Sequence, residues 1–135
     1  GTLDNFVVIT PDGHNFELDG PEGSMEAGYT LKNGIVHGNS DSRNSGDLIN
    51  YDDNTIVSLE NIFITNINEG QVIDINPSEA PQVTFSNVVL DVSAENLADY
   101  VAGGEVPNGV EAGQSPNGVD TSVFGWTWAA QYGAF

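Results

Sequence analysis

The sequence Leu59-Glu60-Asn61-Ile62-Phe63-Ile64 decides the fold, because the chain repeats its pattern. Related stretches begin at Leu3, Leu31 and Phe85, so successive copies are separated by 28, 28 and 26 residues. Four copies at a nearly constant spacing are typical of a solenoid, in which each repeat forms one coil and buries its apolar face only against its neighbours.

Each copy carries an asparagine at its third position, namely Asn5, Asn33, Asn61 and Asn87. Apolar residues with a period of two on either side of the asparagine predict two short strands that meet at a bend. In coils stacked in parallel, neighbouring strands lie about 4.8 Å apart, and the four asparagines fall in one column. Because an amide can donate to one neighbour and accept from the other, we expect a structural hydrogen-bonded ladder.

A second pattern repeats out of phase with the first, in copies that begin at Gly13, Gly46 and Gly70. It predicts inward columns of Phe16, Ile49 and Ile73 and of Leu18, Tyr51 and Ile75, and an outward column of Glu17, Asn50 and Asp74. Each coil then has three strand pieces and three turns. We therefore expect an all-β fold, a short right-handed parallel β-helix of about four coils, whose handedness follows from the general rule for parallel crossovers.

The repeats occupy residues 1–92, and residues 93–135 continue the same domain without the period. Residues 93–102 predict a short helix, with Ser93 as its N-cap and Gly103 just past its end. A loop rich in glycine, proline and asparagine follows. It contains Pro-Asn-Gly-Val twice, which is typical of turns.

The chain of 135 residues has 2 Lys and Arg against 20 Asp and Glu, for a formal charge of −18. This charge argues against nucleic acid, anionic membranes and polyanionic polysaccharides as partners. The sequence has no cysteine for a disulfide and no apolar run long enough to predict a membrane span.

Aromatic residues gather at the end of the sequence. Phe124, Trp126 and Trp128 alternate, so in a strand they would share one face. Together with Tyr132 and Phe135 they could cover the last coil, close a strand edge, or bind a partner or the face of a neutral sugar. Because the open edges of a solenoid need cover, capping of the last coil is the simplest expectation.

This ending, Trp126-Thr127-Trp128-Ala129 followed by Gly133-Ala134-Phe135, resembles that of a group of secreted β-helix repeat proteins of Gram-negative cell surfaces. Those proteins are similar in placing β-helix-like repeats before the ending. The resemblance implies that the chain is the C-terminal part of a longer precursor. It implies no catalytic residues. The repeat architecture and the acidity of the chain predict that it is secreted or displayed at the cell surface.

Four carboxylates, Glu17, Asp19, Asp52 and Asp74, are expected to gather where the turns of the second pattern stack. Ca²⁺ accepts six to eight oxygen ligands in irregular geometry, so this acidic face is a candidate calcium site. The sequence has neither an EF-hand loop nor a Gly-Gly-x-Gly-x-Asp repeat, and a solvated acidic face is the alternative.

These patterns predict an extracellular or cell-surface structural or interaction module without enzymatic activity. The alternative is a carbohydrate-binding or carbohydrate-cleaving β-helix protein that uses its acidic face. The first repeat begins at Leu3 at full hydrophobicity, and an uncovered first coil would expose Phe6, Val8 and Phe16 to water. We therefore expect another polypeptide, an upstream precursor segment or a partner subunit, at the edge of the first coil.

Overall fold

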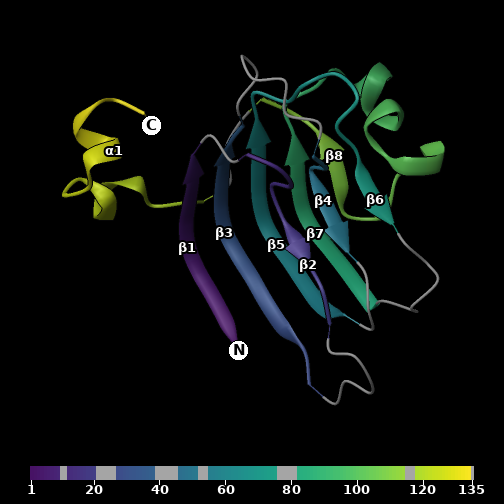
Figure 1. The fold of residues 1–135 in the computed structure, drawn as a ribbon, viewed down its shortest axis with the longest axis horizontal. Coiled ribbons are helices and arrows are strands. Elements are labelled where there is room, and N and C mark those ends of the chain that lie inside the picture. Colours follow the sequence, from purple (N-terminus) through teal and green to yellow (C-terminus); the bar gives the residue numbers. More distant parts are fainter. Residues whose placement is uncertain are drawn as a thin grey trace.

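The computed structural model describes residues 1–9, 12–20, 27–38, 46–51, 55–75, 82–114 and 118–134, and within them it is mostly β. The described strands form two parallel sheets, a larger one in the order β1-β3-β5-β7-β8 and a smaller one in the order β2-β4-β6 (Figure 1). The expectation of a parallel, mostly β fold is therefore confirmed. The strands are β1 (Thr2–Ile9), β2 (Glu17–Leu18), β3 (Tyr29–His37), β4 (Ile49–Tyr51), β5 (Ile56–Thr65), β6 (Ile73–Ile75), β7 (Gln82–Leu90) and β8 (Val110–Ala112).

The register of the larger sheet follows the repeat of the sequence. Leu31 pairs with Leu3 on one side and with Leu59 on the other, and Leu59 pairs with Phe85. The asparagine of each copy adopts a left-handed conformation, with φ between 53° and 59°, which asparagine tolerates better than most residues. Each long strand therefore bends at its asparagine and continues as one strand, where the sequence predicted two separate pieces.

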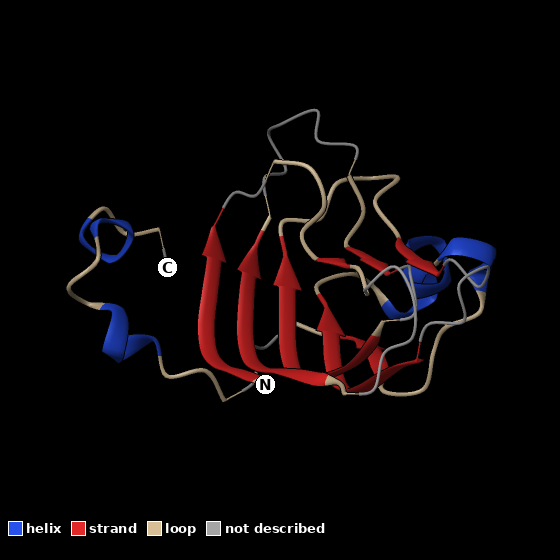
Figure 2. Ribbon diagram, turned by 60° about the horizontal axis from the view of Figure 1, so that its bottom comes forward, coloured by secondary structure: helices blue, strands red, loops and turns tan. Residues whose placement is uncertain are grey.

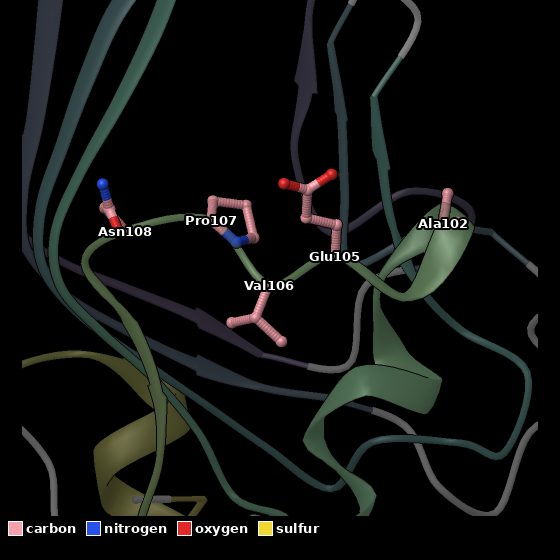
Figure 3. A pocket seen from close by; sticks show the side chains of 6 residues that line it. Ala102, Glu105, Val106, Pro107 and Asn108 are labelled. Carbon is pink, nitrogen blue, oxygen red and sulfur yellow. The ribbon is translucent and has the colours of Figure 1, made fainter.

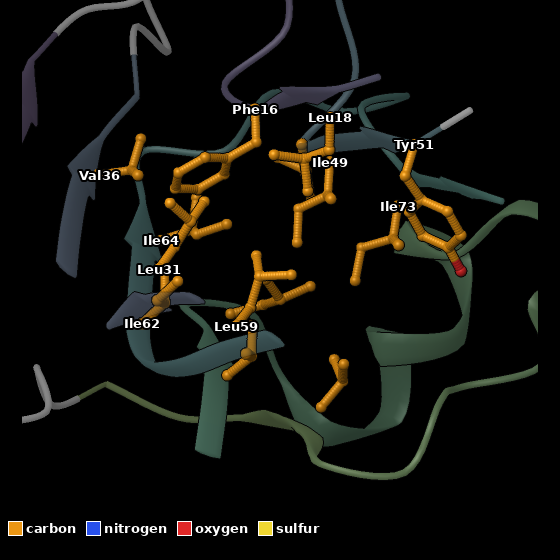
Figure 4. Close-up of a cluster of buried hydrophobic side chains, with 14 of the residues drawn as sticks. Phe16, Leu18, Leu31, Val36, Ile49, Tyr51, Leu59, Ile62, Ile64 and Ile73 are labelled. Atoms are coloured by element: carbon orange, nitrogen blue, oxygen red, sulfur yellow. The ribbon is translucent and has the colours of Figure 1, made fainter. Parts of the chain in front are cut away.

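The core lies between the two sheets (Figure 4). Side chains of the smaller sheet, such as Ile49 and Ile73, face those of the larger sheet, such as Leu59, Ile62 and Ile64, and all five are fully buried. Burying one such side chain stabilises a fold by roughly 1.5–3 kcal/mol. This aliphatic cluster is therefore the main source of cohesion between the sheets.

Two phenylalanines close the core at its N-terminal end. Phe6 and Phe16 are only 8% and 9% exposed, and their rings meet edge to face at 6.1 Å between centroids. The Phe6 ring occupies the space over Gly34, where a Cβ would collide with it. The two rings are therefore not exposed to water as expected, because they pack on each other and Phe6 also packs over Gly34 of β3. Val8 is half-buried against the same core.

Short helical segments cover the opposite end of the core (Figures 1 and 2). The 3₁₀ segments are η2 (Ala94–Tyr100) and η3 (Ala102–Gly104), so the helix predicted over residues 93–102 is present in 3₁₀ form. The Ser93 side chain makes no capping hydrogen bond. Between the two segments, Val101 is buried and pairs with Ile73, which continues the smaller sheet. None of the described helices is long and apolar enough to cross a membrane.

The C-terminal tail, defined here as residues 118–134, returns to the other end of the molecule and lies beside β1 (Figure 1). It contains η4 (Thr121–Phe124) and α1 (Trp128–Gln131). The Thr127 hydroxyl caps α1 by accepting a hydrogen bond from the Ala130 N–H at 3.2 Å. Trp126 and Trp128 therefore do not share a strand, and side-chain caps stabilise the helical turns of this segment.

Candidate interaction surface at the edge of the first strand

The asparagine column forms a hydrogen-bonded ladder across three strands of the larger sheet, β3, β5 and β7. Asn87 Nδ2 donates to Asn61 Oδ1 at 3.1 Å, and Asn61 Nδ2 donates to Asn33 Oδ1 at 3.2 Å. The ladder ends where Asn33 Nδ2 donates to Asp4 Oδ1 at 2.7 Å. The structure thus brings three of the four predicted asparagines together, and a carboxylate takes the place expected for Asn5.

Asp4 is the charged end of this ladder and binds β1 to β3. Its carboxylate lies 3.2 Å from Lys32 Nζ in the neighbouring strand. The Asn33 amide and, after it, the Lys32 ammonium hold the pKa of Asp4 below its usual value. Because Asp4 is then ionised at neutral pH, the ion pair and the end of the ladder are maintained together.

Asn5 bonds instead to the C-terminal tail. Its Nδ2 donates to the Asp120 carbonyl oxygen at 3.3 Å, and its Oδ1 accepts from the Asp120 N–H at 3.0 Å. One residue earlier in the tail, Val119 packs on an outward-facing apolar row of the larger sheet, formed by Ile35, Phe63 and Val89. The tail therefore crosses the outer face of the sheet and is fastened at its first strand.

Beyond this attachment, the tail exposes aromatic side chains. Trp126, Trp128 and Tyr132 are 79%, 74% and 77% exposed, and we refer to these three residues as the aromatic patch. The Trp128 and Tyr132 rings stack with centroids 5.6 Å apart and planes 16° apart. The patch lies near β1, at the opposite end of the larger sheet from β8, its last strand. Phe124 is half-buried, and Phe135 lies outside the described residues.

The outer edge of β1 ends the larger sheet, and within the described residues no strand pairs with it. Directly after β3, the Gly38 N–H donates to the Thr65 carbonyl of β5. Backbone groups alternate in direction along a strand, so Ile35, three residues earlier, directs its backbone groups toward β1. Val7 of β1 lies opposite Ile35. In a parallel pair, when one of two opposite residues directs its backbone groups toward the neighbouring strand, the other directs its groups away from it, so the Val7 N–H points away from the sheet. Leu3, on the same strand, is 51% exposed. This edge combines free backbone groups with an exposed apolar side chain.

The predicted calcium ligands are brought together only in part. Glu17 and Asp74 flank Asn50 in one row of the smaller sheet, and Asp19 follows the end of β2. Asp52 lies outside the described residues. Within the described part of the chain, no three histidine, aspartate or glutamate side chains gather in a way that could hold a metal ion. Calcium binding on this face stays a prediction.

Sequence reasoning missed Asp4, Lys32 and Asp120 as parts of this surface. A signal existed for the first two, because Asp4 and Lys32 carry opposite charges and stand in register one position before the asparagines of their repeats. The contact of Asp120 uses its backbone groups, and its residue type therefore gave no indication of it.

Comparison with known proteins adds no family to this description. No protein-family model matches the chain, and no curated protein or solved structure matches it significantly. The function is therefore argued from the geometry of the surface.

Proposed function

We propose that this chain is a short right-handed parallel β-helix that serves as a non-catalytic structural or interaction module, secreted or displayed at the cell surface. The alternation of the chain between two parallel sheets supports a helical winding. The asparagine ladder supports regular stacking of successive turns. The right hand is that of nearly all parallel crossovers.

The outer edge of β1 carries the interaction part of this proposal. A strand from another polypeptide, either an upstream precursor segment or a partner subunit, pairs with it and extends the larger sheet. Main-chain hydrogen bonds at an added strand provide affinity, and side chains on alternate positions provide specificity. Val7 N–H and the neighbouring outward groups supply the bonds, and Leu3 supplies an apolar contact.

The charge of the chain restricts the partner. At a formal charge of −18, the molecule repels acidic partners at long range and attracts basic ones. The aromatic patch has no charged residue in it and lies beside the same edge, so it offers contact area to the added polypeptide. We therefore propose a partner strand that is neutral or basic.

A synthetic peptide of residues 29–37 tests this proposal, because that sequence already pairs with β1 in the fold and carries a lysine and a histidine but no acidic residue. Mixed with the whole chain, it is expected to slow hydrogen exchange at the Val7 amide. Val7→Pro removes the outward N–H without breaking a bond to β3 and should abolish the effect. Val7→Thr, the matched control, keeps the N–H and should preserve it.

One outcome would contradict strand addition at β1. If the Val7 amide of the unmodified chain exchanges at the same rate with and without the peptide, and sedimentation velocity shows no complex, the edge does not accept a strand and the proposal fails.

A further inference from the structure

A hollow of about 290 Å³ lies at the end of the larger sheet opposite β1. Within the described residues, β8 pairs only with the second half of β7, from Val88 to Leu90, and no strand follows the first half, which leaves room for the hollow. Gly109 approaches the Phe85 carbonyl so closely that a Cβ would collide with it. This close approach holds Pro107 and Asn108 over the uncovered half of β7 as one wall of the hollow.

The other walls of the hollow are largely apolar. Tyr51 and Phe85 stand side by side with ring centroids 6.3 Å apart and planes tilted by 56°. Val83 and Pro107 complete the apolar lining. The volume is close to the lower limit of about 300 Å³ for small-molecule pockets, so it suits a ligand the size of a single ring.

Two uncharged polar side chains, Tyr51 and Asn108, border this apolar lining. Tyr51 as a whole residue is only 5% exposed, but its hydroxyl is not among the buried side-chain atoms of the described residues that lack a partner, so this hydroxyl remains in contact with solvent. Figure 4 shows this hydroxyl directed away from the aliphatic side chains of the core. Burial and, secondarily, the charge of Asp74 raise the pKa of Tyr51 to about 12, so the hydroxyl remains a donor at neutral pH. Asn108 is exposed and places an amide in the lining. Thr84 lies on β7 between the inward-facing Val83 and Phe85, so its side chain points to the opposite face of the sheet and only its backbone borders the hollow.

The lining selects a neutral ligand. None of the six described residues in its lining is charged, and the acidity of the chain as a whole disfavours anions. An apolar wall beside hydrogen-bonding groups suits a ring that has one apolar face and a rim of hydroxyls. A second hollow of about 450 Å³ shares Pro107 and Asn108 with the first and has Glu105 in its wall (Figure 3).

We propose that the hollow between Tyr51, Phe85 and Asn108 binds one ring of a neutral saccharide. The apolar face of the sugar packs on the two aromatic rings, and its hydroxyls bond to the Tyr51 hydroxyl and to the Asn108 amide. The neighbouring hollow receives the adjoining ring of a longer saccharide. This site lies at the opposite end of the sheet from β1 and does not depend on the interaction proposed there.

Nuclear magnetic resonance titration of the whole chain tests the site, with the methyl glycosides of glucose, galactose and mannose as neutral probes and choline as a cationic probe. At least one glycoside is expected to shift the backbone amides of Thr84, Phe85 and Asn108. Tyr51→Phe keeps the ring and removes only the hydroxyl, so the variant should fold normally. Its affinity for the glycoside should fall about tenfold, which corresponds to the loss of one hydrogen bond. Asn108→Ala, at an exposed position, should weaken binding similarly. Trp128→Ala, in the aromatic patch, is the control and should leave the affinity unchanged.

Three results would overturn the proposal. The first is that no glycoside shifts these amides at millimolar concentrations. The second is that choline shifts them and the sugars do not, which would identify a cation site. The third is that sugar shifts occur only around the aromatic patch and vanish in Trp128→Ala, which would place sugar binding on the tail.

Discussion

Asn5 and Asp120 are 115 residues apart in the chain and hold each other by two hydrogen bonds, one in each direction, at 3.3 Å and 3.0 Å. The contact joins the first strand to the C-terminal tail and closes the chain into a loop over the outer face of the larger sheet. The Asn5 side-chain amide, which was expected to continue the asparagine ladder, makes this contact instead.

Asn5→Gly should release the tail while leaving the sheets folded. Glycine keeps the left-handed conformation of this position, at φ 59°, so only the side-chain bonds are lost. The Asp120 amide is expected to exchange faster with solvent, while amides in β5 keep their protection. Thr127→Ala is the control, since it removes the cap of α1 and leaves the Asn5 contact in place. Unchanged exchange at Asp120 would show that packing of Val119 is sufficient to hold the tail.

Asn61 lies in the middle of the ladder and should be the most costly rung to lose. Asn61→Gly keeps the backbone conformation and removes the bonds to Asn33 and Asn87, for an expected loss of about 1–3 kcal/mol in the free energy of unfolding. Asn61→Ala loses the same bonds and is also strained at φ 54°, which costs roughly 1–2 kcal/mol more. Urea denaturation measures both variants. Equal stability of the two would contradict a contribution from backbone strain.

Asn15, which lies shortly before β2, destabilises the folded state, and its replacement by an apolar residue should stabilise the protein. The residue is 9% exposed, and neither polar atom of its side chain has a partner within the described residues. In the next copy of the second pattern the corresponding residue is Leu48, which is fully buried. Asn15→Leu is expected to raise the free energy of unfolding by about 1–3 kcal/mol.

The control for this variant is Asn50→Leu, in which an amide that donates to Asp47 at 3.2 Å is lost and no gain is expected. A lower melting temperature for Asn15→Leu would mean that ordered water satisfies the native amide.

Tyr51 should make the protein sensitive to alkali. Its pKa rises from 10.0 to about 12 on folding, so the folded state favours the neutral phenol. The resulting stabilisation is complete below about pH 10 and is lost as the pH rises toward 12. Denaturation curves measured across this range should fall more steeply for the native protein than for Tyr51→Phe. Parallel curves would show that the phenol ionises as readily in the folded state as in the unfolded one.

The periodicity of the sequence was sufficient to predict how the strands pair. The pairs Leu3 with Leu31, Leu31 with Leu59 and Leu59 with Phe85 are those of the structure, and so is the row of Glu17, Asn50 and Asp74. A parallel stack places equivalent residues of successive repeats opposite each other, so spacing along the chain translates directly into register.

Features that break the repeat could not be found in this way. The capture of Asn5 by Asp120 depends on where the tail runs, and no periodicity describes the tail. The alternation of Trp126 and Trp128 suggested a strand, but the hydroxyl of Thr127 between them caps a helical turn. A threonine followed by Ala129, Ala130 and Gln131, all compatible with a helix, was the available signal and was weaker than the aromatic pattern.

The fit of the Phe6 ring over Gly34 has a consequence for the pairing of strands during folding. Successive repeats are so alike that a nascent chain could pair the wrong turns with little penalty. In the inward row of Phe6, Gly34, Ile62 and Val88, the glycine alone leaves room for a phenyl ring. A misplaced first strand laid against β5 would drive that ring into Ile62. The contact between Phe6 and Gly34 therefore favours β3 as the neighbour of β1, because β5, whose sequence is similar, has no room for the Phe6 ring.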